Sequence, residues 1–152
     1  MIELRAARET DAAAMVEVQN AIYRAGGRAS PVDDALVRER YLDGAYRVAC
    51  TVADQEGRVL GFQSLKRSWP DNPYDVPEGW GIIGTHIHPS AGRRGIGRRL
   101  FAISLSAAKA AGLRHIDASI AADNGPALAY YAAMGFTPYR QGDDVIPHRF
   151  DL

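Results

Sequence analysis

The sequence predicts a single α/β domain, residues 1–152, in which a mixed, mostly antiparallel sheet is flanked by about four helices. Three observations support this prediction. The chain has 152 residues, the usual size of one domain. Apolar residues recur with a period of two in some segments and at helical spacing in others. These segments follow one another in the order β-α-α-β-β-β-α-β-α-β-β, with no repeat or linker between them.

The N-terminal part is predicted to form a strand followed by two helices. Apolar and polar residues alternate over Ile2 to Ala6, as in a half-buried strand. Thr10 then opens an Ala-rich run whose apolar residues keep helical spacing until Gly26-Gly27. A second, shorter helix is expected over Pro31 to Leu42, with Ser30 as its N-cap.

The middle of the chain is predicted to contain a hairpin, a loop and a third strand. Arg47 to Ala53 and Val59 to Leu65 both read as strands, and the turn residues Gln55-Glu56-Gly57 lie between them. Three prolines make Trp69 to Glu78 an exposed loop. The strand pattern resumes over Ile82 to His88.

The C-terminal part is predicted to alternate helices and strands. Its elements are a long helix between Gly95 and Gly112, a strand over Ile116 to Ile120, a helix between Asn124 and Gly135, and short strands over Phe136 to Tyr139 and Val145 to Phe150. We therefore expect a strand, a Gly-rich loop and a helix to follow one another around residue 95.

Charge and composition argue against several classes of protein. Eighteen Lys and Arg residues balance eighteen Asp and Glu residues, so no overall field favours nucleic acid or an anionic membrane. No stretch approaches the roughly 20 apolar residues of a membrane span. Cys50 is the single cysteine and alternates with valines, as a core residue does. The first residues lack the pattern of a secretion signal, so we expect a cytoplasmic protein.

The segment Gly92-Arg93-Arg94-Gly95-Ile96-Gly97-Arg98 has the composition of a phosphate-binding loop. Its glycines allow a tight turn that points free N–H groups at an anion on the helix N-terminus. It is not a Walker A loop, and Leu100 stands where a dinucleotide loop has its third glycine. These differences disfavour ATP, GTP and NAD, although a nucleotide-binding enzyme stays an alternative.

Two motifs resemble those of the GCN5-related N-acetyltransferase (GNAT) superfamily. Ile87-His88-Pro89 and Gly95-Ile96-Gly97 match the end of its central strand and its cofactor loop, while Gly92 replaces the usual Gln or Arg. The second motif is matched at every position by Asn124, Ala127, Tyr131, Gly135 and Phe136. The order of elements also fits, and the phosphinothricin and amino-acid acetyltransferases are the most similar branch.

The resemblance implies a GNAT-like fold and direct acetyl transfer from acetyl-CoA to a primary amine of a small molecule, an amino acid or an analogue. Acetyl-CoA would lie in a splay between the strand ending at His88 and the strand His115 to Ala121, and Tyr131 would donate a proton to the CoA thiolate. Metal is not expected. The residues expected to contact the cofactor are Ile87, His88, Arg93, Arg94, Gly95, Ile96, Gly97, Arg98, Asn124, Ala127 and Tyr131.

The general base does not follow from the resemblance, because Gly81 and Ile82 occupy the places where many members have a carboxylate. His86 is our candidate, since an imidazole with a pKa near 6.5 suits proton transfer at neutral pH. Glu78 reaches the site only if its loop folds back, and His88 is a weaker candidate.

A different class of function is a degenerate acyl-CoA-binding or sensing module without turnover. The missing carboxylate and Gly92 favour it. The acceptor pocket carries no motif, although Trp69, Tyr74 and Trp80 are candidates to line it. The sequence leaves open whether the chain forms a homodimer.

Overall fold

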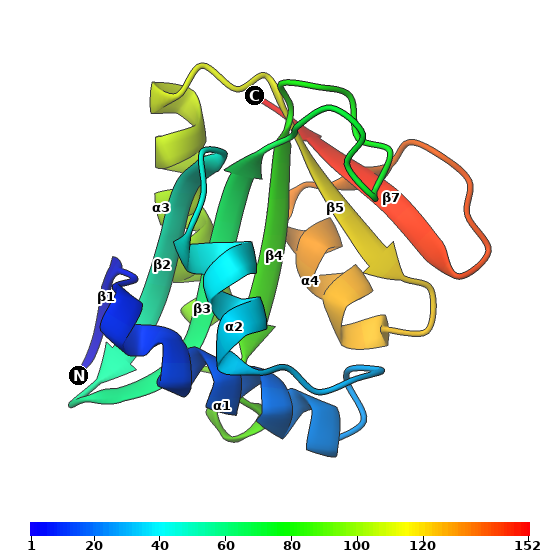
Figure 1. Cartoon of the computed structure of the whole chain (residues 1–152). Coiled ribbons are helices and arrows are strands. Elements are labelled where there is room, and N and C mark those ends of the chain that lie inside the picture. Colours follow the sequence, from blue (N-terminus) through cyan, green and yellow to red (C-terminus); the bar gives the residue numbers. More distant parts are fainter.

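Seven strands form one sheet in the computed structural model, which describes residues 1–152, and their order is β1-β2-β3-β4-β5-β7-β6. Every neighbouring pair is antiparallel except β4 and β5, so the predicted mixed, mostly antiparallel sheet is confirmed (Figure 1). The strands are β1 (Ile2–Ala6), β2 (Arg47–Gln55), β3 (Arg58–Arg67), β4 (Gly81–Ile87), β5 (His115–Ala121), β6 (Thr137–Pro138) and β7 (Val145–Asp151).

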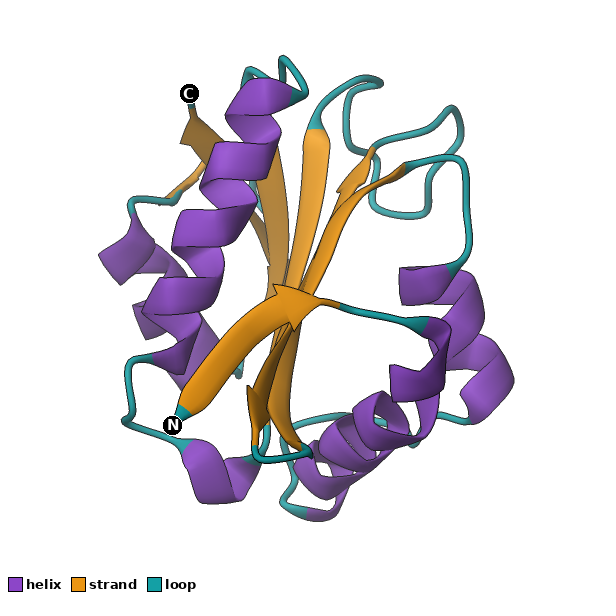
Figure 2. Ribbon diagram, turned by 90° about the vertical axis from the view of Figure 1, so that its left-hand side faces the viewer, coloured by secondary structure: helices purple, strands orange, loops and turns teal.

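Helices cover both faces of this sheet. Figure 2 shows the strands between two helical layers, with α1 and α2 on one side and α3 and α4 on the other. The helices are α1 (Ala12–Arg24), α2 (Asp34–Val37), α3 (Ile96–Ala110) and α4 (Gly125–Met134), and α2 runs on as a π-helical turn, Arg38–Leu42. Short 3-10 turns, Glu9–Asp11 and Pro89–Ala91, precede α1 and α3. None of the helices has the length and apolar character required to cross a membrane.

Each helical layer has its own apolar core. Met15 and Val18 of α1 pack with Cys50 and Phe62 of the sheet, and the predicted core position of Cys50 is confirmed. On the other face, the residues that pack under α3 and α4 include Phe101, Ile116, Tyr131 and Phe136. Strand β3 is buried along most of its length because both layers cover it.

The pairing between β4 and β5 stops almost at once. It joins Gly81 to Ile116 and Ile82 to Asp117, and beyond these residues the two strands diverge (Figure 1). Each strand stays paired on its outer side, β4 with β3 up to Ile87 and β5 with β7 up to Ala121. The sheet therefore opens in a splay between two fully paired arms, as the family resemblance implies.

The splay leaves one edge of β4 without a strand partner. The N–H of His88 donates to the carbonyl oxygen of Leu60 at 2.8 Å, so even-numbered residues of this strand direct their backbone groups at β3. The backbone groups of Thr85 and Ile87 therefore point toward the splay, where β5 has moved away. Free main-chain donors and acceptors at this edge are available to a ligand.

Some element boundaries differ from the prediction. Helix α1 begins at Ala12 after a 3-10 turn, rather than at Thr10, and the predicted strand Phe136 to Tyr139 is shorter in the structure, where β6 spans Thr137–Pro138. The second helix begins at Asp34, because the Asp33 carboxylate accepts a hydrogen bond from the Leu36 N–H at 2.9 Å.

Ser30 is therefore not the N-cap of this helix, which corrects the prediction. Asn20 of α1 explains why the helix does not start at Pro31. Its side chain accepts a hydrogen bond from the Val32 N–H at 2.8 Å and donates one to the Val32 carbonyl oxygen at 3.1 Å. The residues before Asp34 are thus tied to α1 instead of joining α2.

Asp11 ties β1 to the start of α1. Its carboxylate accepts two hydrogen bonds from the Arg5 guanidinium, both at 2.8 Å, and one from the Arg8 N–H at 2.7 Å. These contacts, the Arg5 hydrogen bond above all, lower the pKa of Asp11 below its usual value of 3.8. The folded structure therefore stabilises the ionised form of the Asp11 carboxylate relative to its protonated form.

We expect Asp11→Asn to reduce the free energy of unfolding at pH 7 by about 1–3 kcal/mol, because Arg5 loses the nearer of its two charged partners and keeps only Asp54, at 3.1 Å. Since the pKa is lower in the folded chain, this stabilisation is present above the unfolded pKa and is lost as pH falls through the folded pKa. Urea unfolding of both proteins at pH 7 and at about pH 2 measures the change. Glu9→Gln is the matched control, and an equal difference at both pH values contradicts the prediction.

Candidate functional site

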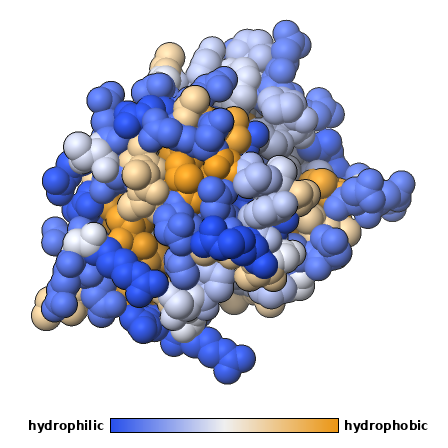
Figure 3. Space-filling view, turned by 60° about the horizontal axis from the view of Figure 1, so that its bottom comes forward, coloured by the Kyte–Doolittle hydropathy of each residue, from blue (hydrophilic) through white to orange (hydrophobic).

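A cavity of about 870 Å³ lies at the open end of the splay. Its walls come from the end of α1, from β4, from the loop before α3 and from one side of α4. Figure 3 shows the face at the bottom of Figure 1, where apolar side chains gather in a hollow that hydrophilic residues surround. We call this space the first cavity. Its volume lies in the upper part of the range of about 300–1,000 Å³ typical of small-molecule sites.

The loop before α3 presents unpaired backbone donors to the first cavity. Gly95 adopts a left-handed conformation, with φ of 71°, and α3 starts directly after it without a side chain capping its N-terminus. The first N–H groups of a 15-residue helix therefore face the cavity unpaired, and the helix dipole adds partial positive charge there. This geometry suits a phosphate or pyrophosphate group.

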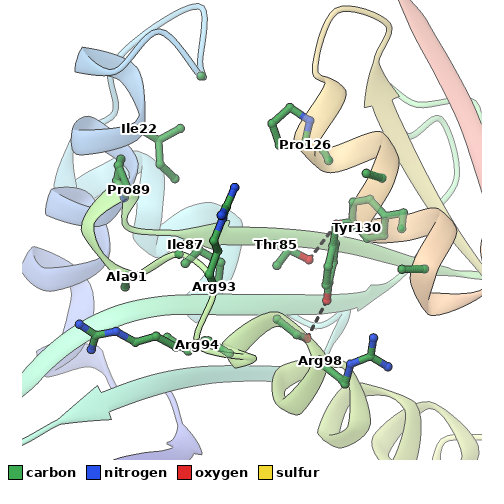
Figure 4. A pocket seen from close by; sticks show the side chains of 18 of the residues that line it. Ile22, Thr85, Ile87, Pro89, Ala91, Arg93, Arg94, Arg98, Pro126 and Tyr130 are labelled. Carbon is green, nitrogen blue, oxygen red and sulfur yellow. Dashed lines mark hydrogen bonds between the residues drawn. The ribbon is translucent and has the colours of Figure 1, made fainter.

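Three arginines surround the same loop in different ways (Figure 4). Arg93 has a positive φ of 63°, rare for a residue with a side chain, and Figure 4 shows it projecting between Pro89 and Pro126. Arg94 is directed to the side, where it donates a hydrogen bond to the Gln55 side-chain oxygen at 3.2 Å. Arg98 extends from the first turn of α3. Arg93 and Arg98 are exposed, so both are free to meet an anion.

Helix α4 starts and stops as the sequence predicts. The Asn124 side chain accepts a hydrogen bond from the Ala127 N–H at 3.1 Å, which makes it the N-cap. Gly135 ends the helix in a left-handed conformation with φ of 106°. Between these ends, Ala127, Tyr130 and Tyr131 line the first cavity.

A buried hydrogen-bond network holds both tyrosines in place. The Gln63 amide nitrogen donates to the Thr85 hydroxyl at 2.9 Å and to the Tyr130 hydroxyl at 3.0 Å. Tyr130 in turn donates to the Gly97 carbonyl oxygen at 2.8 Å, which Figure 4 marks with a dashed line. Thr85 and Tyr131 share a hydrogen bond of 2.8 Å. The network joins β3, β4, α3 and α4 across the splay.

Tyr131 stays protonated at neutral pH in this environment. Burial raises its pKa above the usual 10, and the hydrogen bond to Thr85 offsets only part of the rise. When the Thr85 hydroxyl donates to the Tyr131 oxygen, the proton of Tyr131 is free to be given to another group. A buried phenol held this way is suited to donate a proton to an anion that forms beside it.

The structure brings together ten of the eleven residues that the sequence assigns to the cofactor. His88 is the exception. Its Nδ1 atom accepts a hydrogen bond from the Ser90 N–H at 3.1 Å and so caps the turn Pro89–Ala91. The residues that line the first cavity are Ile87, Arg93, Arg94, Gly95, Ile96, Gly97, Arg98, Asn124, Ala127 and Tyr131.

Sequence reasoning missed Tyr130, Thr85 and Gln63. Tyr130 and Tyr131 are adjacent in α4, so their side chains point about 100° apart around the helix axis. For this reason only Tyr131 was expected to face the cofactor. The cavity wraps around α4, and both side chains reach it. Gln63 lies in the middle of an apolar strand, and a buried polar residue there was the one signal that pointed to a network.

A second cavity, of about 230 Å³, lies on the α1/α2 face of the sheet. Gly84 and His86 of β4 line it, whereas Thr85 and Ile87 of the same strand line the first cavity. Strand β4 thus separates the two cavities at the splay. The residues that line the second cavity are Arg28, Arg40, Tyr41, Ser64, Lys66, Tyr74, Ile82, Ile83, Gly84, His86 and Ser119.

His86 is enclosed by groups from α1, the π-helical turn and β3. The Gln19 amide nitrogen lies 3.4 Å from its Nδ1 atom, and the Tyr41 hydroxyl lies 3.4 Å from its Nε2 atom. The Phe62 ring is 4.8 Å away, centroid to centroid. Burial, together with the charges of Arg28 and Arg40, lowers the pKa of His86 to about 3. Its imidazole is therefore neutral at pH 7. Because the Gln19 amide nitrogen can only donate, Nδ1 is the acceptor of that contact and Nε2 carries the hydrogen.

The loop between β3 and β4 sends only one of its predicted pocket residues to the second cavity. Tyr74 lines it, whereas Trp80 packs on His115 and Tyr139, with ring centroids 4.7 and 5.4 Å away. Trp69 covers Lys66, whose ammonium lies 4.7 Å from the ring centroid. Glu78 is exposed and lines neither cavity.

Beside the second cavity lies a buried carboxylate that sequence reasoning did not single out. Asp117 of β5 is fully buried, and it accepts hydrogen bonds from the Ser119 hydroxyl at 2.8 Å and the Tyr139 hydroxyl at 2.5 Å. Burial raises its pKa. Asp117 faces Ile82 in the sheet register, and these two residues form the last pair before the splay.

Residues 12–136 match the sequence profile of the Acetyltransferase (GNAT) family. A curated relative, mycothiol acetyltransferase from Clavibacter michiganensis subsp. michiganensis (strain NCPPB 382), is 33% identical over 103 residues. The match covers 68% of this chain and 30% of that protein, so the chain spans about a third of the length of this relative.

Solved structures share the whole fold. A GCN5-related N-acetyltransferase from Kribbella flavida has a TM-score of 0.80 at 21% identity, over 99% of this chain and 98% of its own. The PaiA N-acetyltransferase from Thermoplasma acidophilum, solved in complex with coenzyme A, has a TM-score of 0.78 at 15% identity. That alignment covers 100% of this chain and 99% of the other.

The packing of Gly97 against Tyr130 yields a test of the loop. A Cβ atom at residue 97 would lie 2.7 Å from the Tyr130 ring, whereas residue 125 has open space around it and does not line the first cavity. We expect Gly97→Ala to weaken the binding of coenzyme A by about 1–3 kcal/mol, as overpacking does, because Tyr130 and the loop must shift. Gly125→Ala should bind as the wild type does. Calorimetric titration compares the three proteins, and equal losses for both variants contradict the prediction.

Proposed function

The chain belongs to the acetyltransferase (GNAT) family, and we propose that it transfers an acetyl group from acetyl-CoA directly to a primary amine of a small molecule, an amino acid or an analogue. One observation carries the proposal. The first cavity joins an uncapped helix N-terminus, suited to a pyrophosphate, to a buried protonated tyrosine across the open edge of β4. Acetyl-CoA carries a pyrophosphate at one end and a thioester at the other, and it supplies the activated acetyl group.

In this proposal, main-chain groups make most of the contacts to acetyl-CoA, the acetyl donor. The N–H groups at the start of α3 hold the pyrophosphate, and Arg93 and Arg98 add positive charge around it. The backbone of Thr85 and Ile87, free at the splay, pairs with the amides of the pantetheine arm, and Asn124 contacts the same arm. A backbone N–H near Ile87 stabilises the negative charge that develops on the thioester oxygen.

The transfer needs two proton movements. The amine nitrogen attacks the acetyl carbonyl carbon, a C–N bond forms, and the C–S bond breaks. Tyr131 donates its proton to the sulfur that leaves, and Thr85 keeps the phenol in position. A base on the other side of β4 accepts the proton that the nitrogen loses.

His86 is the base in this proposal. It lies in the second cavity, on the acceptor side of β4, and its imidazole is neutral at pH 7. Glu78 and His88 are weaker candidates, because Glu78 lines neither cavity and His88 is engaged with Ser90. Burial is the main cause of the low pKa of His86, and the charges of Arg28 and Arg40 lower it further. An acceptor anion bound beside them removes only this second cause.

The proposed partner is a small-molecule amine, with neither nucleic acid nor membrane involved. The net charge of zero supports this proposal, because nucleic-acid binding depends on excess positive charge. We also propose a cytoplasmic location. Cys50 is a buried free thiol whose pKa burial raises to about 12, so it plays no part in the transfer.

The proposed function is tested first by donor binding and then by turnover. A ligand at 100 times its dissociation constant stabilises a protein by about 2.7 kcal/mol, so acetyl-CoA should raise the melting temperature by several degrees. ATP and NAD should not. A screen of amines for thiol release follows. Binding without turnover for any amine would indicate a sensing module instead, and stabilisation by ATP or NAD alone would indicate a nucleotide-binding protein.

We expect Tyr131→Phe to reduce kcat by about 10²–10⁴-fold, because the thiolate then leaves without its proton donor. Binding of acetyl-CoA should change little, since only a hydroxyl is removed. Thiol release and the thermal shift, measured on the same samples, separate the two effects. Tyr23→Phe changes an exposed tyrosine of α1 and serves as the control. An unchanged kcat in Tyr131→Phe excludes this residue as the acid.

A comparison of two variants tests the base. We expect His86→Gln to lower kcat by about 10²-fold or more, because a glutamine amide cannot accept the proton. Glu78→Gln should leave kcat unchanged. Steady-state rates at saturating acetyl-CoA give kcat for both variants. A kcat that falls in Glu78→Gln and stays unchanged in His86→Gln assigns the base to Glu78.

A further inference from the structure

The second cavity carries charge of one sign only. Arg28 follows α1, Arg40 lies in the π-helical turn, and Lys66 is on β3, yet all three line this small cavity. None of the residues that line it is an aspartate or a glutamate. Segments far apart in the sequence thus bring three cationic side chains to one site.

No carboxylate lies within ion-pair distance of these three cations, and Asp117 beside the cavity is engaged with Ser119 and Tyr139. The Arg28 Nε atom donates to the Ser30 carbonyl oxygen at 3.3 Å, and Lys66 lies over the Trp69 ring. None of the three forms an ion pair, whereas Arg5 and Arg38 hold carboxylates at 2.8 and 2.6 Å. Like charges that converge on a partly enclosed space repel one another, so the arrangement calls for an anion from outside the chain.

The positive charge of these side chains also affects the pKa values of titratable groups around the second cavity. Burial and the charge of Arg40 lower the pKa of Lys66, and Glu39 offsets only part of this change. Arg28 and Arg40 also act on His86 and on Tyr41. An anion bound among these side chains relieves the repulsion, and it offsets the part of the His86 pKa shift that Arg28 and Arg40 cause, whereas the larger part, which burial causes, remains.

The cavity also reaches the splay. Gly84 of β4 and Ser119 of β5 line it, on the two strands that diverge. Residue 84 has no side chain, so no side-chain atoms of this residue stand between the cavity and the edge of β4. The volume of about 230 Å³ is smaller than the range of about 300–1,000 Å³ for drug-sized ligands, so the occupant is small.

We propose that the acceptor is a small amine that carries a carboxylate or another anionic group, which Arg28, Arg40 and Lys66 bind while the amino group faces the splay. This inference rests on the proposed function and deepens it, because it names the chemistry that selects the acceptor. It ranks amines with two acidic groups above amines with one, and both above amines with none. Polyamines and basic peptides are rejected, since they repel the same three cations.

Matched acceptors test the ranking. Glutamate and glutamine differ by one negative charge at the far end, alanine and ethylamine differ by the α-carboxylate, and putrescine carries a second positive charge. Thiol release at saturating acetyl-CoA gives kcat/KM for each. A charged hydrogen bond contributes enough for about a tenfold to hundredfold preference, so we expect steps of this size from glutamate to glutamine and from alanine to ethylamine.

Two variants test the residues. Lys66→Gln and Arg40→Gln should raise KM for glutamate by about tenfold to a hundredfold, with little change in kcat. The dissociation constant of acetyl-CoA should stay the same, because the donor lies on the other side of β4. Lys109, the other lysine of the chain, is exposed near the end of α3, and Lys109→Gln is the control.

Calorimetric titration of glutamate and ethylamine into the CoA-loaded protein supplies a readout that needs no turnover. Binding of glutamate that Lys66→Gln weakens supports the proposal. The proposal is overturned if ethylamine or putrescine binds or reacts as well as glutamate does. It is also overturned if no amine with an acidic group binds to the protein or reacts with acetyl-CoA. Acetyl-CoA still stabilises the protein in those cases if the proposed function is right, so the two failures are distinguishable.

Discussion

The early end of pairing between β4 and β5 is the constraint on which the rest of the site depends. Two residue pairs join the strands, and then each strand follows its outer neighbour. The unpaired edge of β4 is stable only because β3 and β7 satisfy the opposite edges along their full lengths. A sheet that continued to pair at this point would have no free main-chain groups for a ligand and no passage between its two faces. The cavities, the exposed amides and the position of both tyrosines all follow from this divergence.

The two arms of the sheet still need a connection, and buried polar groups supply it. The Ser104 hydroxyl of α3 donates a hydrogen bond to the Gln63 side-chain oxygen at 2.6 Å, and the Gln63 amide nitrogen donates to the hydroxyls of Thr85 and Tyr130. Every polar atom of the Gln63 side chain is paired, which is what makes a polar residue tolerable in a fully buried strand. The network thus ties α4, the helix that follows β5, to β3, β4 and the start of α3, and it holds these elements in one arrangement.

Local patterns in the sequence predicted most of the fold and ten of the residues that line the first cavity. The loop around Gly95 and the helix from Asn124 are short motifs in which spacing determines geometry, so their residues gather as expected. The cap at Ser30 was wrong because a distant contact, Asn20 to Val32, decides where that helix begins. The acceptor side could not be predicted in the same way. Its cations come from three separate segments, and no spacing rule brings Arg28, Arg40 and Lys66 together.

Strand β4 separates two chemical tasks by the simple alternation of its side chains. Thr85 and Ile87 face one cavity, whereas Gly84 and His86 face the other. Substitutions at residues 84 and 86 can therefore alter the second cavity without changing the side chains that line the first, and substitutions at residues 85 and 87 act in the reverse way. An insertion or deletion of a single residue in β4 has a different consequence. It exchanges the two sets of side chains, so divergence within this strand is expected to proceed by substitution rather than by changes in length.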